Sequence, residues 1–323
     1  METKRFAEYD LSRMMLGTVQ FGMPYGVANR TGQPSYRDVL DIITAAVEGG
    51  VNCFDTAAAY GTSEEVLGRA LRELGLLERV VVVTKVRVLS PEVLADAAKT
   101  AQAIEHSVAE SRQQLGIECL PIVLFHRETD GVHLDVLESL KARGWLKHAG
   151  VSCDNRPGLA QPLVAGGRAA ALQLPGNALD RRHQKTGVFR EAAARGVAVF
   201  IRSVYLQGLL VMPEDVIPPA LHEVVPVRRR LATIAHEAGM TLAELALRYM
   251  LAQEGVTCVL TSVETVAQVR ENIALFEHGP LAADMVKTVD AAVTELPEMV
   301  LTPGQWPNDK YKAHQKRQDQ RAH

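Results

Sequence analysis

The chain has 323 residues, of which 47% are hydrophobic and 23% charged, a balance typical of a soluble globular protein with a sizeable core. Its formal net charge of −3 provides no overall basic field, so we expect no binding to nucleic acid or to an anionic membrane surface. No stretch approaches the roughly 20 apolar residues of a membrane span, and METKRFAEYDLSRMM at the N-terminus has no apolar signal core, so we expect a cytoplasmic protein.

Short apolar runs alternate with longer amphipathic stretches along the whole chain. The apolar runs predict eight strands, at residues 14–22, 51–55, 80–86, 120–126, 148–152, 170–175, 197–203 and 257–262. Between them, as in 36–50 and 135–145, apolar residues recur three to four positions apart, which predicts helices. Residue pairs typical of helix starts occur at three places: Thr62 with Glu65, Thr241 with Glu244, and Ser90 with Pro91.

Eight strands, most of them followed by a helix, predict an α/β fold with a parallel sheet and helical crossovers. Several strands are apolar throughout, as expected for strands buried on both faces. Closing eight such units gives a (β/α)8 TIM barrel, which we predict as a single domain over residues 1–307. An open doubly wound sheet is the alternative, but it usually carries GxGxxG after its first strand, and LGTVQFGMPYG lacks that motif.

Two segments fall outside the regular pattern. Residues 203–226 contain four prolines, and a loop of that length in a compact domain is usually functional or mobile. Residues 308–323 are polar and almost without apolar anchors, so we predict a disordered tail.

The four cysteines are widely spaced and show neither a CxxC motif nor a spacing to histidine that indicates a metal site: Cys53, Cys119, Cys153 and Cys258. We therefore predict reduced core cysteines and no bound metal.

Four proton-active side chains lie at or just after the carboxyl ends of predicted strands. Asp55 ends the second strand, and Tyr60 lies in the loop that follows it. Lys85 and His126 lie at the ends of the third and fourth strands. Each has an ordinary structural explanation when taken alone, such as a loop cap or a strand end that meets solvent. In a TIM barrel these ends meet at one mouth, so together the four residues indicate a reactive site.

The chemistry of these four groups fits together. A tyrosine has an ordinary pKa near 10. A nearby ammonium is expected to lower the pKa of the phenol, and a carboxylate would hold that ammonium in place. A histidine beside the phenol could hydrogen-bond a substrate oxygen or relay its proton. Such a site could protonate a carbonyl oxygen while hydride reaches the carbon, and because no side chain carries hydride, a nicotinamide cofactor is implied. A Schiff-base aldolase or isomerase with Lys85 as nucleophile is the rival enzyme class.

The sequence resembles the aldo-keto reductase family over about residues 13–277. The resemblance is carried, in family order and spacing, by GVNCFDTAAAYGTSEEVLGRAL, VVVTKV, VLFH, GVS, LQLPGN and VLTSVETVAQVRENI. It implies that an aldehyde or ketone is reduced with hydride from NADPH bound across the barrel mouth. Tyr60 would be the general acid/base, Lys85 and Asp55 would tune it, and His126 would orient the carbonyl. Because some relatives dock on partners, a nicotinamide-binding regulatory subunit with slow turnover is a further alternative.

The resemblance also implies cofactor contacts. Ser152 and Gln173 match the residues that hold the nicotinamide carboxamide, although Cys153 stands where the family usually has Asn. Arg202 replaces the aromatic residue that usually stacks on the nicotinamide; its planar guanidinium could also stack, and a strand-end salt bridge is the alternative. The other predicted contacts are Thr18, then Ser203, Gln207 and Gly208 for the phosphates, and Ser262, Gln268, Glu271 and Asn272 near the adenosine.

The sequence is compatible with either of two nicotinamide nucleotides, NADP(H) and NAD(H). NADP(H) is the family default and is favoured here. Relatives that prefer it commonly have Lys or Arg within the stretch corresponding to 262–268, whereas this chain has neither there. Glu264 would repel a 2′-phosphate or bind a free 2′-hydroxyl, so NAD(H) is the alternative. Arg270 could compensate from the next turn, and Gln268 could simply close a capping box with Thr265.

The substrate is predicted to be a small carbonyl compound. Residues 23–35 add polar groups near the mouth, which favours a hydroxylated, sugar-like carbonyl. Met23, Tyr25 and Tyr205 are candidate lining residues, although each could equally serve packing.

Overall fold

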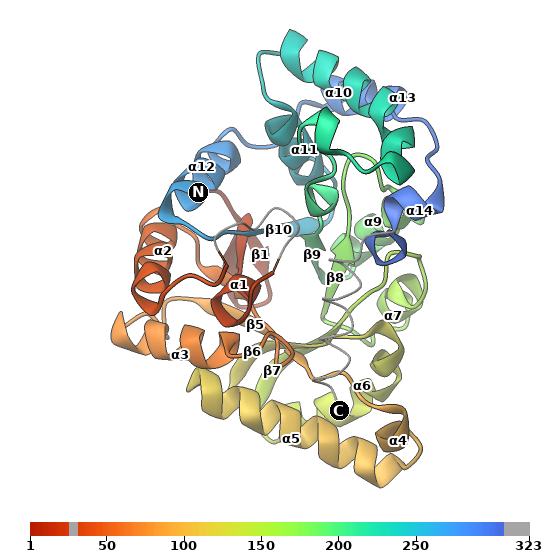
Figure 1. Cartoon of the computed structure of the whole chain (residues 1–323). Coiled ribbons are helices and arrows are strands. Elements are labelled where there is room, and N and C mark those ends of the chain that lie inside the picture. Colours follow the sequence, from red (N-terminus) through yellow and green to blue (C-terminus); the bar gives the residue numbers. More distant parts are fainter. Residues whose placement is uncertain (26–31, 307–323) are drawn as a thin grey trace.

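The computed structural model describes residues 1–25 and 32–306. Eight parallel strands close into a barrel surrounded by helices (Figure 1), which confirms the predicted TIM barrel and excludes the open doubly wound sheet. The barrel strands, in chain order, are β3 (Met14–Gly17), β4 (Cys53–Asp55), β5 (Val81–Val86), β6 (Leu120–Phe125), β7 (Leu146–Ser152), β8 (Ala171–Pro175), β9 (Ala198–Arg202) and β10 (Val256–Ser262).

Each barrel strand pairs with the next along the chain, and the barrel closes where β10 pairs with β3. At this seam Ser262 lies opposite Gly17, and on the other side of β3 Gly17 lies opposite Asp55. The carboxyl ends of β10, β3 and β4 therefore lie side by side, with a glycine in the middle. This is the end of the barrel at which reactive residues are expected.

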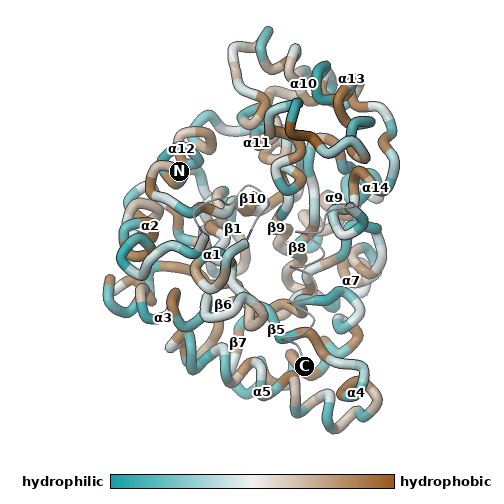
Figure 2. Tube along the Cα trace, in the orientation of Figure 1, coloured by the Kyte–Doolittle hydropathy of each residue, from teal (hydrophilic) through white to brown (hydrophobic). Residues whose placement is uncertain are grey.

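Apolar residues on both faces of the strands build two cores. Inward side chains such as Met15, Leu124 and Phe200 fill the barrel, whereas outward ones such as Phe54 and Val123 pack against the helices. This burial on both sides explains why several strands are apolar throughout. Along the tube in Figure 2, hydrophobic and hydrophilic residues alternate on the outer helices, whose inner faces complete the larger core.

Three of the four cysteines lie in the core, as predicted. All four cysteines are free thiols; Cys53, Cys153 and Cys258 are buried, and Cys119 is half-buried.

Amphipathic helices cover the outside of the barrel. They are, in chain order, α2 (Tyr36–Glu48), α3 (Ser63–Glu73), α5 (Ala97–Leu115), α6 (Leu134–Ala142), α7 (Ala160–Ala165), α9 (Val188–Ala194), α10 (Val225–Glu237), α11 (Leu242–Leu251), α12 (Val266–Glu277) and α13 (Ala283–Ala292). Four short helices, α1 (Val19–Gly22), α4 (Pro91–Leu94), α8 (Arg182–Lys185) and α14 (Glu298–Leu301), lie in the connections. None of the helices within the described ranges is long and apolar enough to cross a membrane.

Of the three predicted helix starts, the N-cap at Ser90 is confirmed, and Thr241 caps its helix without the return bond from Glu244 that a capping box has. The Ser90 hydroxyl accepts a hydrogen bond from the Val93 amide, and the Thr241 hydroxyl accepts one from the Glu244 amide. The capping box at Thr62 is wrong: its side chain makes no capping bond, because φ −94° and ψ 13° are not the extended backbone that an N-cap side chain needs.

The first predicted strand, 14–22, is too long. β3 ends at Gly17 because both the amide and the hydroxyl of Thr18 bind the Asp55 carbonyl oxygen, each at 2.9 Å. The chain then turns into α1, which brings Gly22 against the loop that carries Tyr60.

An N-terminal hairpin that the sequence analysis missed closes the opposite end of the barrel. Strands β1 (Thr3–Phe6) and β2 (Tyr9–Ser12) pair antiparallel, and Phe6 and Leu11 pack into the inner core. The buried Arg13 guanidinium holds this end by donating to carbonyl oxygens of Val256, Thr257 and Leu251.

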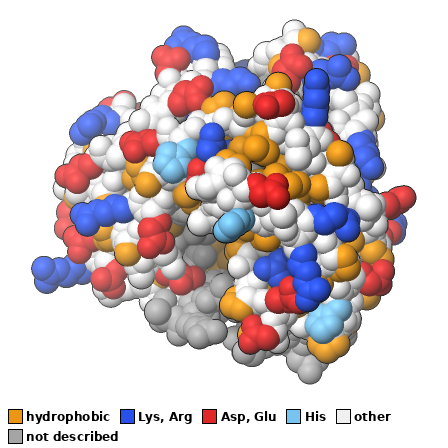
Figure 3. Space-filling model, turned by 90° about the horizontal axis from the view of Figure 1, so that it is seen from above, with side chains coloured by type: hydrophobic (Ala, Val, Ile, Leu, Met, Phe, Trp, Pro, Cys, Tyr) orange, Lys and Arg blue, Asp and Glu red, His pale blue; other side chains and the backbone are white. Residues whose placement is uncertain are grey.

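The long connection at 203–226 contains short turns rather than one irregular loop. Its 3-10 segments are Leu206–Gly208, Glu214–Val216 and Pro219–Val224, and it leads into α10. Together with α10 and α13 this connection forms the top of the molecule in Figure 1. Seen from above, acidic and basic side chains are interspersed around a hydrophobic patch (Figure 3). The predicted tail, 308–323, and part of segment 23–35 lie outside the described residues.

Candidate active site

The structure brings the four proton-active residues together at one mouth of the barrel. Asp55 is the last residue of β4, Lys85 lies one residue before the end of β5, and His126 follows β6 directly. Tyr60 lies in the loop between β4 and α3. Because parallel strands end at the same edge, three strands and one loop suffice to assemble the cluster.

Asp55 and Lys85 form a buried ion pair. The Lys85 Nζ atom lies 2.6 Å from Asp55 Oδ1 and donates a second bond to the Thr56 carbonyl oxygen at 2.9 Å. The Lys85 side chain has no exposed surface. Burial lowers the pKa of Lys85, and the Asp55 carboxylate raises it in part. The ammonium is therefore fixed in direction by two oxygen acceptors.

The aromatic ring of Tyr60 lies between Lys85 and His126. The Lys85 Nζ atom is 5.0 Å from the Tyr60 ring centroid, and the His126 ring meets the Tyr60 ring edge-on with centroids 5.5 Å apart. Burial raises the pKa of the Tyr60 phenol, and the Asp55 charge raises it further, while Arg202 lowers it. The expected net lowering of this pKa is thus not met, because burial and the Asp55 charge outweigh the positive charges nearby.

His126 is held as a neutral imidazole. Its Nδ1 atom is buried and has no hydrogen-bond partner among the described residues. Burial, followed by the positive charges of Lys85, Arg202 and Arg127, lowers the pKa of His126 to about 3. A neutral ring can donate one hydrogen bond to a ligand oxygen without carrying charge into the site.

Two glycines let the Tyr60 loop approach α1. A Cβ atom on Gly22 would collide with the Tyr60 carbonyl oxygen, and one on Gly61, which has φ +60°, would collide with the Gly22 carbonyl oxygen. Below this contact, the Ser63 hydroxyl donates to the Thr18 carbonyl oxygen at 2.7 Å and accepts from Thr56 at 3.0 Å. The loop is therefore set by backbone contact and buried hydroxyls.

A groove of about 510 Å³ runs from this cluster toward the start of α12. That volume is within the range of ligand sites, about 300–1,000 Å³. The groove is lined by Asp55 and Tyr60 and by most of the predicted cofactor contacts, namely Gln173, Arg202, Ser203, Gln207, Gly208, Ser262, Gln268, Glu271 and Asn272.

Two predicted cofactor contacts, Thr18 and Ser152, are not among the lining residues. The Thr18 hydroxyl is fully buried between the Asp55 carbonyl oxygen and the Ser63 hydroxyl. The Ser152 hydroxyl lies 3.5 Å from Gln173 Oε1. Gln173 in turn donates from Nε2 to Asp55 Oδ1 at 2.7 Å, so the predicted carboxamide site is connected directly to the ion pair.

Arg202 lines the groove at the end of β9. Its guanidinium donates to the Cys153 carbonyl oxygen at 3.0 Å and to the Ser203 hydroxyl at 3.4 Å. Within residues 1–25 and 32–306 it forms no ion pair with a carboxylate, which removes the strand-end salt bridge as its explanation. Its positive charge instead acts on Tyr60 and His126.

The backbone after β9 is strained over the groove. Ser203, Leu206 and Gln207 have φ values of 63°, 46° and 52°, a left-handed conformation that favours glycine. Such strain clusters at functional sites. Asn177, which the sequence analysis did not assign, supports this turn by donating to the Ser203 carbonyl oxygen at 3.2 Å.

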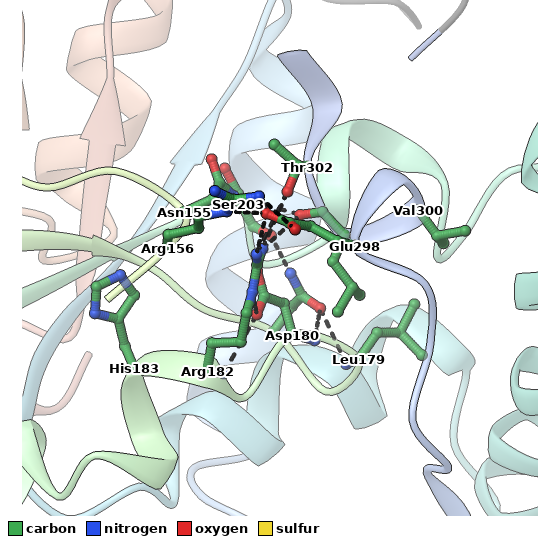
Figure 4. Close-up of polar contacts among 12 residues, drawn as sticks. Asn155, Arg156, Leu179, Asp180, Arg182, His183, Ser203, Glu298, Val300 and Thr302 are labelled. Carbon is green, nitrogen blue, oxygen red and sulfur yellow. Dashed lines mark hydrogen bonds and ion pairs between the residues drawn. The ribbon is translucent and has the colours of Figure 1, made fainter. Parts of the chain in front are cut away.

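A polar cluster beyond Ser203 ties the C-terminal helix to the loops after β7 and β8 (Figure 4). Arg182 donates to Asp180 at 2.7 Å and to the Leu301 carbonyl oxygen at 3.0 Å. Arg156 forms an ion pair with Glu298, in which Nη2 and Oε2 are 2.6 Å apart. The loops that carry Cys153 and Asn177 are thereby held against α14.

The far end of the groove is acidic. Its lining there includes Glu264 and Glu271 together with Gln268 and Asn272, and the described lining of the whole groove contains one cation, Arg202. Gln268 Oε1 accepts a hydrogen bond from the backbone amide of Glu264 at 2.6 Å, and the backbone amide of Gln268 donates to the Thr265 hydroxyl. Arg270 is exposed and does not line the groove.

No metal centre accompanies this cluster in the described part of the chain, where no three His, Cys, Asp or Glu side chains converge. The sequence model of the aldo/keto reductase family matches residues 13–294. The chain belongs to this family.

Related proteins agree with this membership of the aldo/keto reductases. An NADH-specific methylglyoxal reductase of Escherichia coli (strain K12) is 26% identical over 317 residues, which cover 85% of this chain and 92% of that protein. A probable voltage-gated potassium channel subunit beta of Arabidopsis thaliana is 25% identical over 310 residues, with coverage of 85% and 92%. The holo form of an aldo-keto reductase from Bacillus halodurans superposes with a TM-score of 0.74 at 22% identity, over 93% of this chain and 99% of that one, and so shares the fold.

Proposed function

We propose that this aldo-keto reductase reduces a small aldehyde or ketone to the alcohol with a nicotinamide nucleotide as hydride donor. The arrangement that carries the proposal is Tyr60 beside the buried Asp55–Lys85 pair and His126, at the end of a ligand-sized groove. Tyr60 would donate the proton to the carbonyl oxygen. His126 would hold that oxygen by a hydrogen bond from its neutral ring, and Lys85 would stabilise negative charge that develops on the phenol.

The residues of the groove fit a dinucleotide. When bound, the nicotinamide would supply the hydride for the carbonyl carbon. Gln173 would hold the carboxamide, and Ser152, which does not line the groove, would act through Gln173. Arg202 would lie against the ring, and the turn at Ser203 to Gly208 would contact the phosphates. Two buried atoms of lining residues, Tyr205 OH and Thr261 Oγ1, have no partner in the described chain, as expected for groups that a ligand satisfies.

The family resemblance favours NADP(H). The acidic end of the groove instead supports NAD(H). A 2′-phosphate there would meet Glu264 and Glu271, and Arg202, the one cation of the described lining, lies at the end of β9 rather than beside them in the chain. A ribose 2′-hydroxyl, by contrast, can donate to a carboxylate. The NADH-specific relative supports the same choice.

A fluorescence titration is expected to give a lower Kd for NADH than for NADPH. Glu264→Lys combined with Gln268→Arg should reverse the preference by about 10- to 100-fold, because each new cation can bind the 2′-phosphate. Glu277→Lys, an exposed charge change on the same helix, is the control and should leave the preference unchanged. A wild-type preference for NADPH would contradict the NAD(H) assignment, and no reduction of any aldehyde or ketone in a panel would contradict the proposed function.

The pH dependence should differ between the two directions of the reaction. Reduction uses the protonated phenol, and because the pKa of Tyr60 is raised, kcat/KM for reduction should stay flat from acid to mildly alkaline pH. Alcohol oxidation uses the phenolate and should rise about tenfold per pH unit over the same range. His126, with a pKa of about 3, should add no inflection near pH 6.5. A loss of reduction centred near pH 6.5 would contradict these assignments.

Two other functions make different predictions. A Schiff-base enzyme requires a free amine, whereas Lys85 Nζ is buried and bonded to Asp55 and Thr56, which argues against that class. The similarity to a channel subunit supports a regulatory, nucleotide-binding role as the second candidate. Tight NADH binding with very slow turnover on every carbonyl would favour it. The cytoplasmic location stays a prediction.

A further inference from the structure

Gln20 presents an unsatisfied polar group to the groove. It lies in α1, the residue is about 5% exposed, and its Oε1 atom is buried with no hydrogen-bond partner among the described residues. Gln20 also lines the groove. Native proteins pair nearly all buried polar atoms, so an unpaired carboxamide in a binding groove indicates a ligand group that completes it.

Gln20 lies close in the chain to residues that contact the Tyr60 loop and Asp55. Two residues after it, Gly22 is in backbone contact with the Tyr60 loop. Three residues before it, Gly17 lies between Ser262 and Asp55 in the sheet register. A ligand group beside Gln20 is therefore close to the loop that carries Tyr60.

We propose that Gln20 recognises a sugar-type hydroxyl of the bound ligand. A carboxamide accepts at Oε1 and donates at Nε2, and a hydroxyl is the small group that both donates and accepts. A phosphate only accepts hydrogen bonds and would leave Oε1 unpaired, as would an apolar group. The hydroxyl can belong to the carbonyl substrate, next to its reacting carbon, or to the ribose attached to the nicotinamide. The substrate source rests on the proposed function; the ribose source requires only nucleotide binding.

The test replaces Gln20 with methionine, which has a similar length and no hydrogen-bonding amide. Two quantities are measured in wild type and variant: the Kd for NADH by fluorescence titration, and the ratio of kcat/KM for hydroxyacetone to that for acetone. If the substrate carries the hydroxyl, the ratio falls at least about tenfold and the Kd is unchanged. If the ribose carries it, the Kd rises at least about tenfold and the ratio is unchanged. Either result supports the proposal.

A control variant and a measurement of Tm distinguish ligand binding by Gln20 from a role in folding. Gln253→Met makes the same change where Nε2 donates to the Tyr249 carbonyl oxygen, away from the groove, and should alter neither quantity. Because the buried Gln20 oxygen is unpaired in the ligand-free chain, Gln20→Met should keep or raise the Tm. A clear fall in Tm would mean that Gln20 serves the fold, and would overturn the proposal.

The remaining outcomes separate this proposal from the proposed function. An unchanged Kd together with an unchanged substrate ratio overturns the role of Gln20 and leaves the reductase assignment standing. If wild type binds NADH but reduces neither ketone nor any aldehyde, the reductase assignment fails. The Kd of Gln20→Met for NADH then decides the role of Gln20. A value equal to that of wild type overturns the proposal, and a tenfold rise supports it. If wild type binds no nucleotide and reduces no carbonyl, both proposals fail.

Discussion

Tyr60→Phe is expected to lower the turnover number for carbonyl reduction by about 10²- to 10⁴-fold. The phenylalanine ring would keep the contacts with Lys85 and His126, which involve the ring rather than the hydroxyl. It would have no proton to give to the carbonyl oxygen. The affinity for NADH should stay nearly unchanged, since the rest of the groove is intact. Steady-state reduction and a fluorescence titration measure the two quantities.

Tyr36→Phe provides the matched control for this change. The Tyr36 hydroxyl donates to Glu73 at 2.7 Å on the outside of the barrel, so its loss should leave turnover at the wild-type level. Reduction at the wild-type rate by Tyr60→Phe would show that another group supplies the proton, and the proposed mechanism would have to be abandoned.

Breaking the Asp55–Lys85 pair should cost both stability and activity. Removing one partner of a buried pair leaves an uncompensated charge, so Asp55→Asn and Lys85→Met should each lower the free energy of unfolding by about 3–5 kcal/mol. Loss of a proton from Lys85, whose pKa is already lowered, would reduce the cost in Asp55→Asn. The double variant should lose less than the two single losses combined, while remaining inactive.

Urea unfolding of the four proteins measures this coupling. The exposed pair Arg143–Glu105, with side chains 45% and 44% exposed, is the control, and its removal should change stability by about 0–1 kcal/mol. Strict additivity of the Asp55 and Lys85 losses would mean that the two charges do not depend on each other. Recovery of turnover in the double variant would exclude the pair from catalysis.

The fold was predictable from the order of apolar runs, and the location of the site from the polar residues at the carboxyl ends of those runs. Apolar runs with Asp55, Lys85 and His126 at their carboxyl ends imply one mouth once the strands are parallel and the sheet is closed. The direction of each side chain was not predictable, because it depends on partners from distant strands. Lys85, for example, points to Asp55, at the end of the neighbouring strand, and to the carbonyl oxygen of Thr56.

The contacts that were missed lack any local sequence signal. Gln173 donates to Asp55, which is 118 positions away in the chain, and the buried Thr18 hydroxyl donates to the Asp55 carbonyl oxygen. Gln20 looks like an ordinary polar residue, and only its burial without a partner distinguishes it. The N-terminal hairpin was missed because its two strands have four residues each and little apolar alternation.

That hairpin constrains the kinetics of the proposed reaction. Phe6 and Leu11 close one end of the barrel and inward side chains such as Phe200 fill its interior, so under the proposed function nucleotide and carbonyl compound share the opening at the other end. The nucleotide is the larger ligand and would form part of the wall that the carbonyl compound meets. A single shared opening then favours an ordered kinetic mechanism, in which the nucleotide binds first and dissociates last. Product inhibition patterns would reveal this order.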